Sequence, residues 1–460
     1  MRLSDSFKHR YSPSGKVLPA SATIARVLRK LHTVRPPVLH TYRRFQNPLR
    51  MPHYRVWGSD EFLRVAGSAG ANGKGLSWDM ALASGLMELV ERYSCYTFLR
   101  RQWHGDCPLG VSARTQVFAA FLRNFPDPAC FGPTEEVSAF LAKQYFRWYP
   151  VWDLEGKRSW LPLGFFCFVL AGGNGMDSGN TREEALLHGI CEVVERHCLA
   201  LVDIRRLSVP TVVLDKLPAR LSRLVGLVRH ARQEILVKDY SCGLGIPAIG
   251  VLRNVSPSHC VLNVGVASSP QEALGRALTE SAQTETKANW QALSGMKHHF
   301  KAAATVPLTA LAGISSANIK DEIYACEKGL QAKGMRLFFA DAAHRRLGMP
   351  SVIVHIQGAL FSQQSVHPAE SKPPERPLLM GLLNEACAAG KQTWLDHCAG
   401  LGTSPGSKAM VDLYQGAFLW GSGYRTRALK YFVRVMRNRD VIPECRNMAA
   451  DFIRESMLRK

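Results

Sequence analysis

The sequence predicts a mixed α/β (α+β) fold with an internal repeat and a helical C-terminal region. From Tyr54 onward, strand-like runs alternate with long helical patterns. Two of the helical patterns share the motif Glu-x-x-Glu-Arg, at Glu88–Arg92 and Glu192–Arg196. After a proline-containing stretch at 362–376, which we interpret as a linker, the periodicity is helical to residue 460. These three observations define the fold class.

The expected elements follow from hydrophobic periodicity. A short helix is expected near Ile24–His32, and longer helices at 78–101, 181–206, 271–292 and 319–333. Expected strands lie at 145–154, 162–170, 234–240, 246–254, 259–266, 335–341 and 350–356. We therefore divide the chain into a basic N-terminal extension (1–53), a main domain (54–370) and a helical region (377–460). The amphipathic helix at 423–439 is typical of a surface helix docked on a core, and a partner-binding role stays open.

Composition indicates a globular protein with an uneven charge distribution. The 460 residues are 46% hydrophobic and 21% charged, with a net charge of +21. Residues 1–50 carry eleven Lys/Arg against one acid, and residues 421–460 carry ten against four. Such ends suit RNA, an acidic protein or an anionic membrane surface, or simply keep the protein in solution. Base-stacking motifs are absent from the sequence, which disfavours nucleic acid.

The cysteines and the first residues indicate the compartment. Twelve cysteines are scattered singly, without a Cys-x-x-Cys pair, which argues against a structural cysteine–zinc site. They are typical of reduced thiols in a cytoplasmic protein. Residues 1–12 lack the apolar segment of a secretion signal, and Leu161–Gly172 is shorter than the ~20 residues that span a bilayer. We expect a cytoplasmic protein without a membrane partner.

The repeated motif is the strongest functional signal. Residues 84–94 (SGLMELVERYS) and 188–198 (HGICEVVERHC) align, and each follows a glycine-rich segment, expected to be a turn, at 70–75 and 172–179. At ~100° per residue, one face of the first helix carries Ser84, Glu88, Glu91 and Arg92. The matching face of the second carries Asn180, Glu184, His188, Glu192, Glu195 and Arg196. A single Glu–Arg pair four residues apart is an ordinary surface feature worth ~0.3–0.5 kcal/mol, but its repetition behind two glycine-rich segments favours function.

Such residues suit a magnesium–nucleotide site. Mg²⁺ prefers carboxylate, phosphate and water oxygens, and converging glutamates repel one another unless cations lie between them. Arginines can neutralise phosphate, and glycine-rich turns at helix N-termini offer backbone N–H groups to anions. Neither glycine segment has P-loop spacing, and Gly75 stands where a Ser or Thr would bind the metal.

These residues resemble the signatures of the YcaO family. Asn72–Gly75 followed by Ala81–Arg92 is similar to its first signature, and Asn174–Ala185 continuing to Arg196 is similar to its second. The resemblance extends over about residues 54–370 and is greatest to the stand-alone bacterial type. It implies a mixed, layered ATP-binding fold and ATP- and Mg²⁺-dependent phosphorylation of a peptide backbone amide, leading to an azoline, an amidine or a thioamide. It also implies nucleotide contacts from Lys74, Ser84, Glu88, Arg92, Asn180, Glu184, Arg196 and Gln283, and magnesium ligands Glu88, Glu91, Glu192 and Glu195.

Three departures from the family pattern bear on activity. After Gln283 of the third signature, Glu285 stands where an arginine is usual, and Lys287 could replace that cation. Asp177 stands where a small or hydroxyl residue is usual. The end of the sequence, Glu455–Lys460, lacks the proline-rich tail of the azoline-forming cyclodehydratases, which makes cyclodehydratase activity less favoured than another branch such as thioamidation.

Further candidates and two function hypotheses remain open. His188, His197, His344 and His355 could be acid–base groups, with His188 the best placed, although a structural role is the stronger expectation for each. Cys191 and Cys198 could act as nucleophiles or sulfur carriers, but burial as small apolar residues is the stronger expectation. The first hypothesis is an enzyme that modifies a peptide or protein amide, with a partner protein supplying sulfur or substrate recognition. The second is a non-catalytic nucleotide-binding accessory factor, for example in methylthiolation of a ribosomal protein. A homodimer is compatible with either.

Overall fold

The computed structural model describes most of the chain between residues 2 and 360 and part of the C-terminal region. The described ranges are 2–9, 15–66, 68–102, 148–162, 174–231, 233–284, 289–301, 304–360 and positions within 412–456. Strand 163–170, the linker 362–376, Glu285 and Lys287 lie outside them. Two compact units form, the first from 1–100, 151–159 and 172–369 and the second from 101–150, 160–171 and 370–460.

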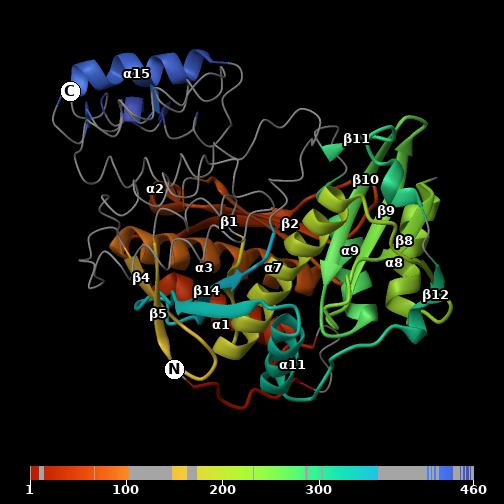
Figure 1. Cartoon of the computed structure of the whole chain (residues 1–460). Coiled ribbons are helices and arrows are strands. Elements are labelled where there is room, and N and C mark those ends of the chain that lie inside the picture. Colours follow the sequence, from red (N-terminus) through yellow and green to blue (C-terminus); the bar gives the residue numbers. More distant parts are fainter. Residues whose placement is uncertain are drawn as a thin grey trace, which may run out of the picture. The chain divides into compact units, whose positions relative to one another are not determined.

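Three sheets carry the described fold (Figure 1). A small antiparallel sheet has the order β1-β2-β3, with strands Leu39–Arg44, His53–Gly58 and Gly70–Lys74. A second has the order β5-β4-β13-β14-β6, with strands Arg158–Pro162, Trp148–Trp152, Arg336–Asp341, Ser351–Gln357 and Met176–Ser178. The third has the order β11-β10-β9-β8-β7-β12, with strands Gln291–Ala292, His259–Val266, Ala248–Ser256, Ile235–Asp239, Thr211–Val213 and Thr305–Pro307.

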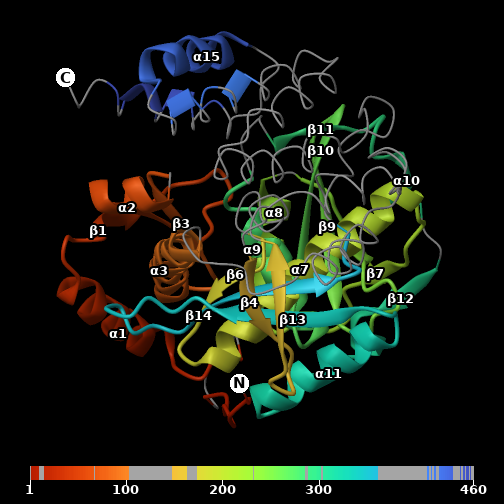
Figure 2. The same ribbon diagram turned by 60° about the vertical axis from the view of Figure 1, so that its left-hand side comes forward.

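Helices are packed on these sheets by their apolar faces (Figures 1 and 2). The bounds are α1 Ala20–Thr33, α2 Asp60–Ala66, α3 Trp78–Gln102, α7 Arg182–Arg205, α8 Ala219–His230, α9 Pro270–Glu280, α10 Lys297–Phe300 and α11 Ile319–Gln331. Helix α7 packs against β14 and β6 of one sheet and β9 and β10 of another. Helices α1, α2 and α3 bury a common core with β2 and β3, and α8 and α9 bury one with β7–β9.

Most expected helices and strands are confirmed, because most of them are long segments with clear hydrophobic periodicity. Helices 78–101, 181–206 and 319–333 correspond to α3, α7 and α11, and the strands near 234–266 and 335–357 are β8, β9, β10, β13 and β14. The mixed α/β class is confirmed with them.

Two expectations are wrong. The helix expected at 271–292 ends with α9 at Glu280, because Ser281, Ala282 and Gln283 bond to carbonyls only three residues back. The glycine-rich segment at 70–75 is mainly strand β3 rather than a turn, pairing with β2 from His53↔Lys74 to Trp57↔Gly70.

The N-terminal residues are in contact with the rest of the first unit. Strand β1 lies in a sheet with β2, so residues before position 53 form part of the layered structure. Ser6 donates its backbone N–H to Oδ1 of Asn318 at 2.9 Å, and Lys8 pairs with the buried Glu322 at 2.5 Å. The boundaries at 53, 370 and 377 stay predictions.

The described part of the second unit contains a helical cluster. Helix α15 (Arg425–Arg437) buries Ala428, Phe432 and Val435. Phe432 stacks on Phe452 with ring centroids 4.5 Å apart. Aromatic packing of this kind fixes α15 within its own unit.

Candidate functional site

The two motif helices are built in the same way. Each follows a short strand, α3 after β3 and α7 after β6. The backbone N–H of Asn72 donates to Oε2 of Glu88 at 3.2 Å, and that of Gly175 donates to Oε2 of Glu192 at 3.0 Å. The internal repeat is therefore structural, because the first glutamate of each motif is held by the segment that precedes its helix.

Glycines allow α3 to lie directly on β2 and α7 to lie directly on β14. A Cβ at Gly85 would lie 2.7 Å from Val56 Cγ2, and one at Gly189 would lie 2.7 Å from Val354 Cγ2. Gly175 has φ +77° and a Cβ there would meet the Val354 carbonyl oxygen at 2.4 Å. These close approaches leave the polar sides of α3 and α7 available for the site.

The apolar faces are as expected. Leu86, Leu89 and Val90 of α3 are fully buried, as are Leu186 and Ile190 of α7. The glutamates and arginines of the two motifs keep partial exposure; for example, Glu88 is 25% and Arg196 is 35% exposed. The helices thus pack by one side and present carboxylates from the other.

Carboxylates from both helices converge. Loss of hydration raises the pKa of Glu192 to about 8, with the charges of Asp177 and Glu195 adding to the shift. Loss of hydration and then the charges of Asp177, Glu192 and Glu88 hold the pKa of Glu91 well above its usual value. Carboxyl groups that raise one another's pKa in this way lie within electrostatic reach of one another.

Cationic side chains surround this carboxylate cluster. Arg92 donates to Oε1 of Glu88 at 2.5 Å, and Arg196 lies 3.7 Å from Oε1 of Glu195. Lys74 pairs with Glu280; its pKa is lowered by loss of hydration, against the opposing charges of Glu88, Glu195 and Glu192. Lys74 is thus close to carboxylates of both motifs.

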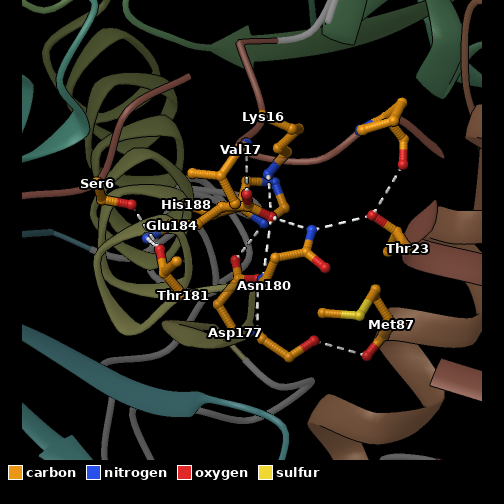
Figure 3. Close-up of polar contacts among 12 residues, drawn as sticks. Ser6, Lys16, Val17, Thr23, Met87, Asp177, Asn180, Thr181, Glu184 and His188 are labelled. Atoms are coloured by element: carbon orange, nitrogen blue, oxygen red, sulfur yellow. Dashed lines mark hydrogen bonds and ion pairs between the residues drawn. The ribbon is translucent and has the colours of Figure 1, made fainter. Parts of the chain in front are cut away.

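The N-terminal segment lies over the start of α7 (Figure 3). Val17 donates its backbone N–H to Oε2 of Glu184 at 3.0 Å, and Lys16 Nζ lies 3.9 Å from Oε1 of the same residue. Asn180 donates from Nδ2 to Glu184 Oε1 at 3.1 Å and to Thr23 Oγ1 at 3.0 Å. Asn180 and Glu184 are therefore brought together, and both are tied to residues 16–23.

Asp177 is paired rather than isolated. Its Oδ2 lies 2.6 Å from Nδ1 of His188, and its Oδ1 accepts the Ser178 N–H at 2.8 Å. Burial raises the pKa of Asp177 to about 7, and loss of hydration lowers that of His188 well below its usual value. Ser178 Oγ donates to the carbonyl of Met87 at 2.8 Å, which connects this segment to α3 (Figure 3).

Gln283 lies just beyond α9 at the edge of the site. Its Nε2 approaches the carbonyl oxygen of Asn72 at 3.5 Å. Ser84 lies on α3 one turn before Glu88 and is half-buried. All the site residues predicted from the sequence therefore belong to the first unit, on α3, β3, α7 and its N-terminal approach, and the end of α9.

Sequence reasoning missed three charged residues near this site. Arg276 and Glu280 precede Gln283 at helical spacing on α9, and a polar stripe of this spacing could have identified them. Arg276 acts electrostatically on both Asp177 and His188, and Glu280 pairs with Lys74. Lys16 belongs to a segment of unremarkable pattern, so the sequence carried no comparable signal for it.

The donor set fits Mg²⁺ and a nucleotide. Four glutamates supply hard oxygen ligands, and Lys74, Arg92 and Arg196 supply cations for phosphate. Two buried polar atoms, Asn180 Oδ1 and Arg196 Nε, have no hydrogen-bond partner among the described residues.

Among the described residues, an open cavity of ≈ 670 Å³ between α8, β8 and β9 includes none of the predicted site residues in its lining.

One further finding concerns membranes. Among the residues that the structure describes, none of the helices combines the length and the apolar character needed to cross a bilayer.

Comparison with known proteins places this site in a family. The family model described as YcaO cyclodehydratase, ATP- and Mg²⁺-binding, matches residues 72–360. A protein of Escherichia coli (strain K12), named ribosomal protein S12 methylthiotransferase accessory factor YcaO, is 28% identical over 246 residues, or 46% of this chain and 40% of that protein. An uncharacterised protein of Methanothermobacter thermautotrophicus is 26% identical over 226 residues, or 43% of this chain and 58% of that protein. The chain thus spans about half the length of the curated relatives it matches, from 40% to 58%.

Solved structures share the fold. A heterocyclase in complex with substrate and cofactor has a TM-score of 0.64 at 23% identity, covering 78% of this chain and 54% of that chain. YcaO from Methanopyrus kandleri, bound with AMPPCP and Mg²⁺, has a TM-score of 0.57 at 17% identity, covering 81% of this chain and 100% of that chain. Because the family model covers more than half of the 460 residues, the chain belongs to the YcaO family of ATP- and Mg²⁺-binding enzymes.

Proposed function

We propose that this protein uses ATP and Mg²⁺ to activate a backbone amide of a peptide or protein for modification, with thioamidation as one candidate outcome. The observation that carries the proposal is the repeated geometry of the two motifs: the Asn72 N–H holds Glu88 beside Arg92, and the Gly175 N–H holds Glu192 on the helix that carries Arg196. Glu88, Glu91, Glu192 and Glu195 would hold Mg²⁺. When bound, Mg·ATP supplies the phosphoryl group that makes an amide oxygen a leaving group.

The remaining side chains bind and orient. Lys74, Arg92 and Arg196 are placed to neutralise phosphate charge, and Ser84, Asn180, Glu184 and Gln283 to position the nucleotide. Asp177 lies 2.6 Å from Nδ1 of His188, so an Nδ1–H donated to this carboxylate would leave Nε2 free to take a proton from an incoming nucleophile. The pair depends on the aspartate at position 177, because a residue without a carboxylate there could not bind His188 in this way.

A second function is supported by one comparison. The Escherichia coli relative is named as an accessory factor, so this chain could bind nucleotide in support of another enzyme instead of catalysing amide modification itself. In either function, a partner protein that supplies sulfur or recognises the substrate is part of the proposal.

One experiment tests the site and separates the two functions. Mg·ATP binding and hydrolysis are measured for the wild type, Glu88→Ala and Glu195→Ala, with and without candidate peptides. We expect both substitutions to weaken binding at least tenfold. Undiminished binding by both variants would remove the site assignment, and wild-type binding without turnover on any peptide would favour the accessory function.

A further inference from the structure

Two histidines and an aspartate form a second polar cluster at the far end of α7. Asp203 lies in the last turn of α7, and His298 and His299 lie on α10. Oδ1 of Asp203 is 3.2 Å from Nε2 of His298 and 2.7 Å from Nε2 of His299. The three ligand atoms lie within 4.8 Å of one another. They come from segments almost a hundred residues apart, so the fold brings them together.

The histidines are buried and oriented by second partners. His299 is fully buried, and its Nδ1 lies 2.5 Å from the hydroxyl of Tyr240, whose pKa is raised well above its usual value mainly by burial. His298 is 8% exposed, and its Nδ1 lies 3.1 Å from Nη1 of Arg206. Metal-binding histidines commonly donate the remote N–H to an acceptor, a role that the Tyr240 hydroxyl can fill for His299 but that the donor-only Arg206 cannot fill for His298.

One atom of the cluster lacks a satisfactory hydrogen bond. Nε2 of His299 is buried and makes no properly directed hydrogen bond within the described structure, although Asp203 is only 2.7 Å away. A buried ring nitrogen without a directed hydrogen bond destabilises the folded state. A bound cation would remove that destabilisation, because the nitrogen lone pair and the carboxylate oxygen could both point at it.

We propose that Asp203, His298 and His299 bind a divalent transition-metal ion, with Zn²⁺ the best fit. Two imidazole nitrogens and one carboxylate oxygen are the ligand types that Zn²⁺ takes, at about 2.0–2.2 Å each in tetrahedral geometry. Tetrahedral ligands at such distances lie roughly 3.3–3.6 Å apart, so the 3.2 Å spacing seen here nearly fits and the 2.7 Å spacing would widen by less than about 1 Å. Tyr240 orients His299, and the fourth ligand position is left for water or another donor.

Binding changes the protonation of His298 in a defined way. Arg206 can only donate, so neutral His298 carries its proton on Nε2 when the ion is absent. The ion takes the Nε2 lone pair, the proton moves to Nδ1, and the exposed Arg206 side chain turns away. No net proton is released from His298.

This site is distinct from the glutamate site. Asp203 is eight residues beyond Glu195 on the same helix, a separation of about 12 Å along the axis. Nitrogen ligands favour zinc over magnesium, whereas the four glutamates favour magnesium. The ion would join the end of α7 to α10 and, through Tyr240, to the segment that follows β8.

Zinc titration of the full-length protein tests the proposal. The purified chain is stripped with a chelator and titrated with Zn²⁺ against a chromophoric competitor in excess Mg²⁺. We expect one tight equivalent in the wild type and in His32→Gln, a control at an exposed histidine of α1. Asp203→Asn, which is nearly isosteric, and His298→Gln should each weaken it at least tenfold, with unchanged circular dichroism. Glu195→Ala should retain it.

Two results would overturn the site. One is an equivalent of zinc that survives both Asp203→Asn and His298→Gln, and the other is an equivalent lost in Glu195→Ala but not in those variants. If the variants fail to fold, zinc X-ray absorption of the wild type decides: two imidazoles in the coordination shell support the proposal, and an oxygen-only or sulfur shell contradicts it.

Discussion

Asp177 and His188 lie with Oδ2 and Nδ1 2.6 Å apart, inside the cluster of glutamates from α3 and α7. The resemblance described above leads us to expect a small or hydroxyl residue at position 177. This chain therefore places a fifth carboxyl group beside the four proposed magnesium ligands, and its consequences can be measured.

Replacing Asp177 by Asn should stabilise the metal-free protein. The charge of Asp177 raises the pKa of Glu91 and Glu192, so its removal relieves repulsion by roughly 1 kcal/mol, while the amide can still accept the Ser178 N–H. Thermal unfolding without Mg²⁺ at pH 9, above the raised pKa values of Asp177 and Glu192, measures the effect. Glu155→Gln, at an exposed acid with the same charge change, is the control and should leave the midpoint unchanged. Equal midpoints for Asp177→Asn and the wild type would contradict the electrostatic coupling.

Stability without Mg²⁺ should fall as the pH rises from about 7 to 9. Below this range His188, His197 and His355, whose pKa values are lowered in the folded state, act in the opposite direction. The pKa of Glu192 is raised to about 8 and that of Asp177 to about 7, so the folded state holds protons that the unfolded state has already released. The stabilisation that these protons give the folded state is complete below the unfolded-state pKa. It is lost gradually as the pH rises to the folded-state pKa. Urea unfolding across this range, with and without Mg²⁺, provides the measurement. Mg²⁺ should flatten the profile, whereas a metal-free profile that rises with pH would show that the pKa directions are wrong.

Adding a methyl group at Gly189 should damage both fold and site. A Cβ there would lie 2.7 Å from Val354 Cγ2, so Gly189→Ala should cost about 1–3 kcal/mol and weaken Mg·ATP binding by displacing α7. Gly226→Ala is the matched control, because a Cβ at Gly226 of α8 meets nothing within 4 Å and should stabilise the helix by about 0.5–1 kcal/mol. Chemical denaturation and nucleotide titration of both variants test this. A Gly189→Ala protein as stable as Gly226→Ala would rule out the close approach.

Lys16→Ala should weaken nucleotide binding while leaving the fold intact. Lys16 lies 3.9 Å from Glu184 and acts electrostatically on Asp177, so its loss leaves the start of α7 more negative and less able to accept phosphate. We expect a several-fold loss in ATP affinity, greatest at low ionic strength because salt screens partly exposed charges. Lys157→Ala, at an exposed lysine between β4 and β5, should have no effect. Equal losses of ATP affinity in Lys16→Ala and Lys157→Ala would show that only the net charge of the protein matters, and not the position of Lys16.

The sequence was informative where periodicity and repetition were strong. The buried faces of α3 and α7 and the pairing of Glu88 with Arg92 follow from helical spacing alone. The resemblance added Gln283, which does lie beside Asn72 although the helix expected to carry it ends earlier. Local polar bonding explains that difference: Thr284 Oγ1 bonds to Asn263 Oδ1 at 3.1 Å, and hydroxyl groups of this kind compete with helix continuation.

Other contacts could not be read from local patterns. Lys16 and His299 owe their positions to segments distant in the sequence, and their own neighbourhoods have no distinguishing periodicity. The glycines at 70–75 predicted a turn. In the structure glycine is required because the backbone of β3 lies against α3, a contact that the local sequence does not reveal. Tertiary packing decided these cases.

The bond from Ser6 to Asn318 has a consequence for synthesis. It joins residues 312 positions apart, and it lies in the segment that also brings Lys16 and Val17 to Glu184. During translation the N-terminal segment emerges first, yet its partner on α11 is made only after more than three hundred further residues. The nascent chain must therefore wait for α11 before this anchor forms, and ribosome-bound chains stalled before Asn318 should bind ATP more weakly than chains stalled after α11 has left the exit tunnel.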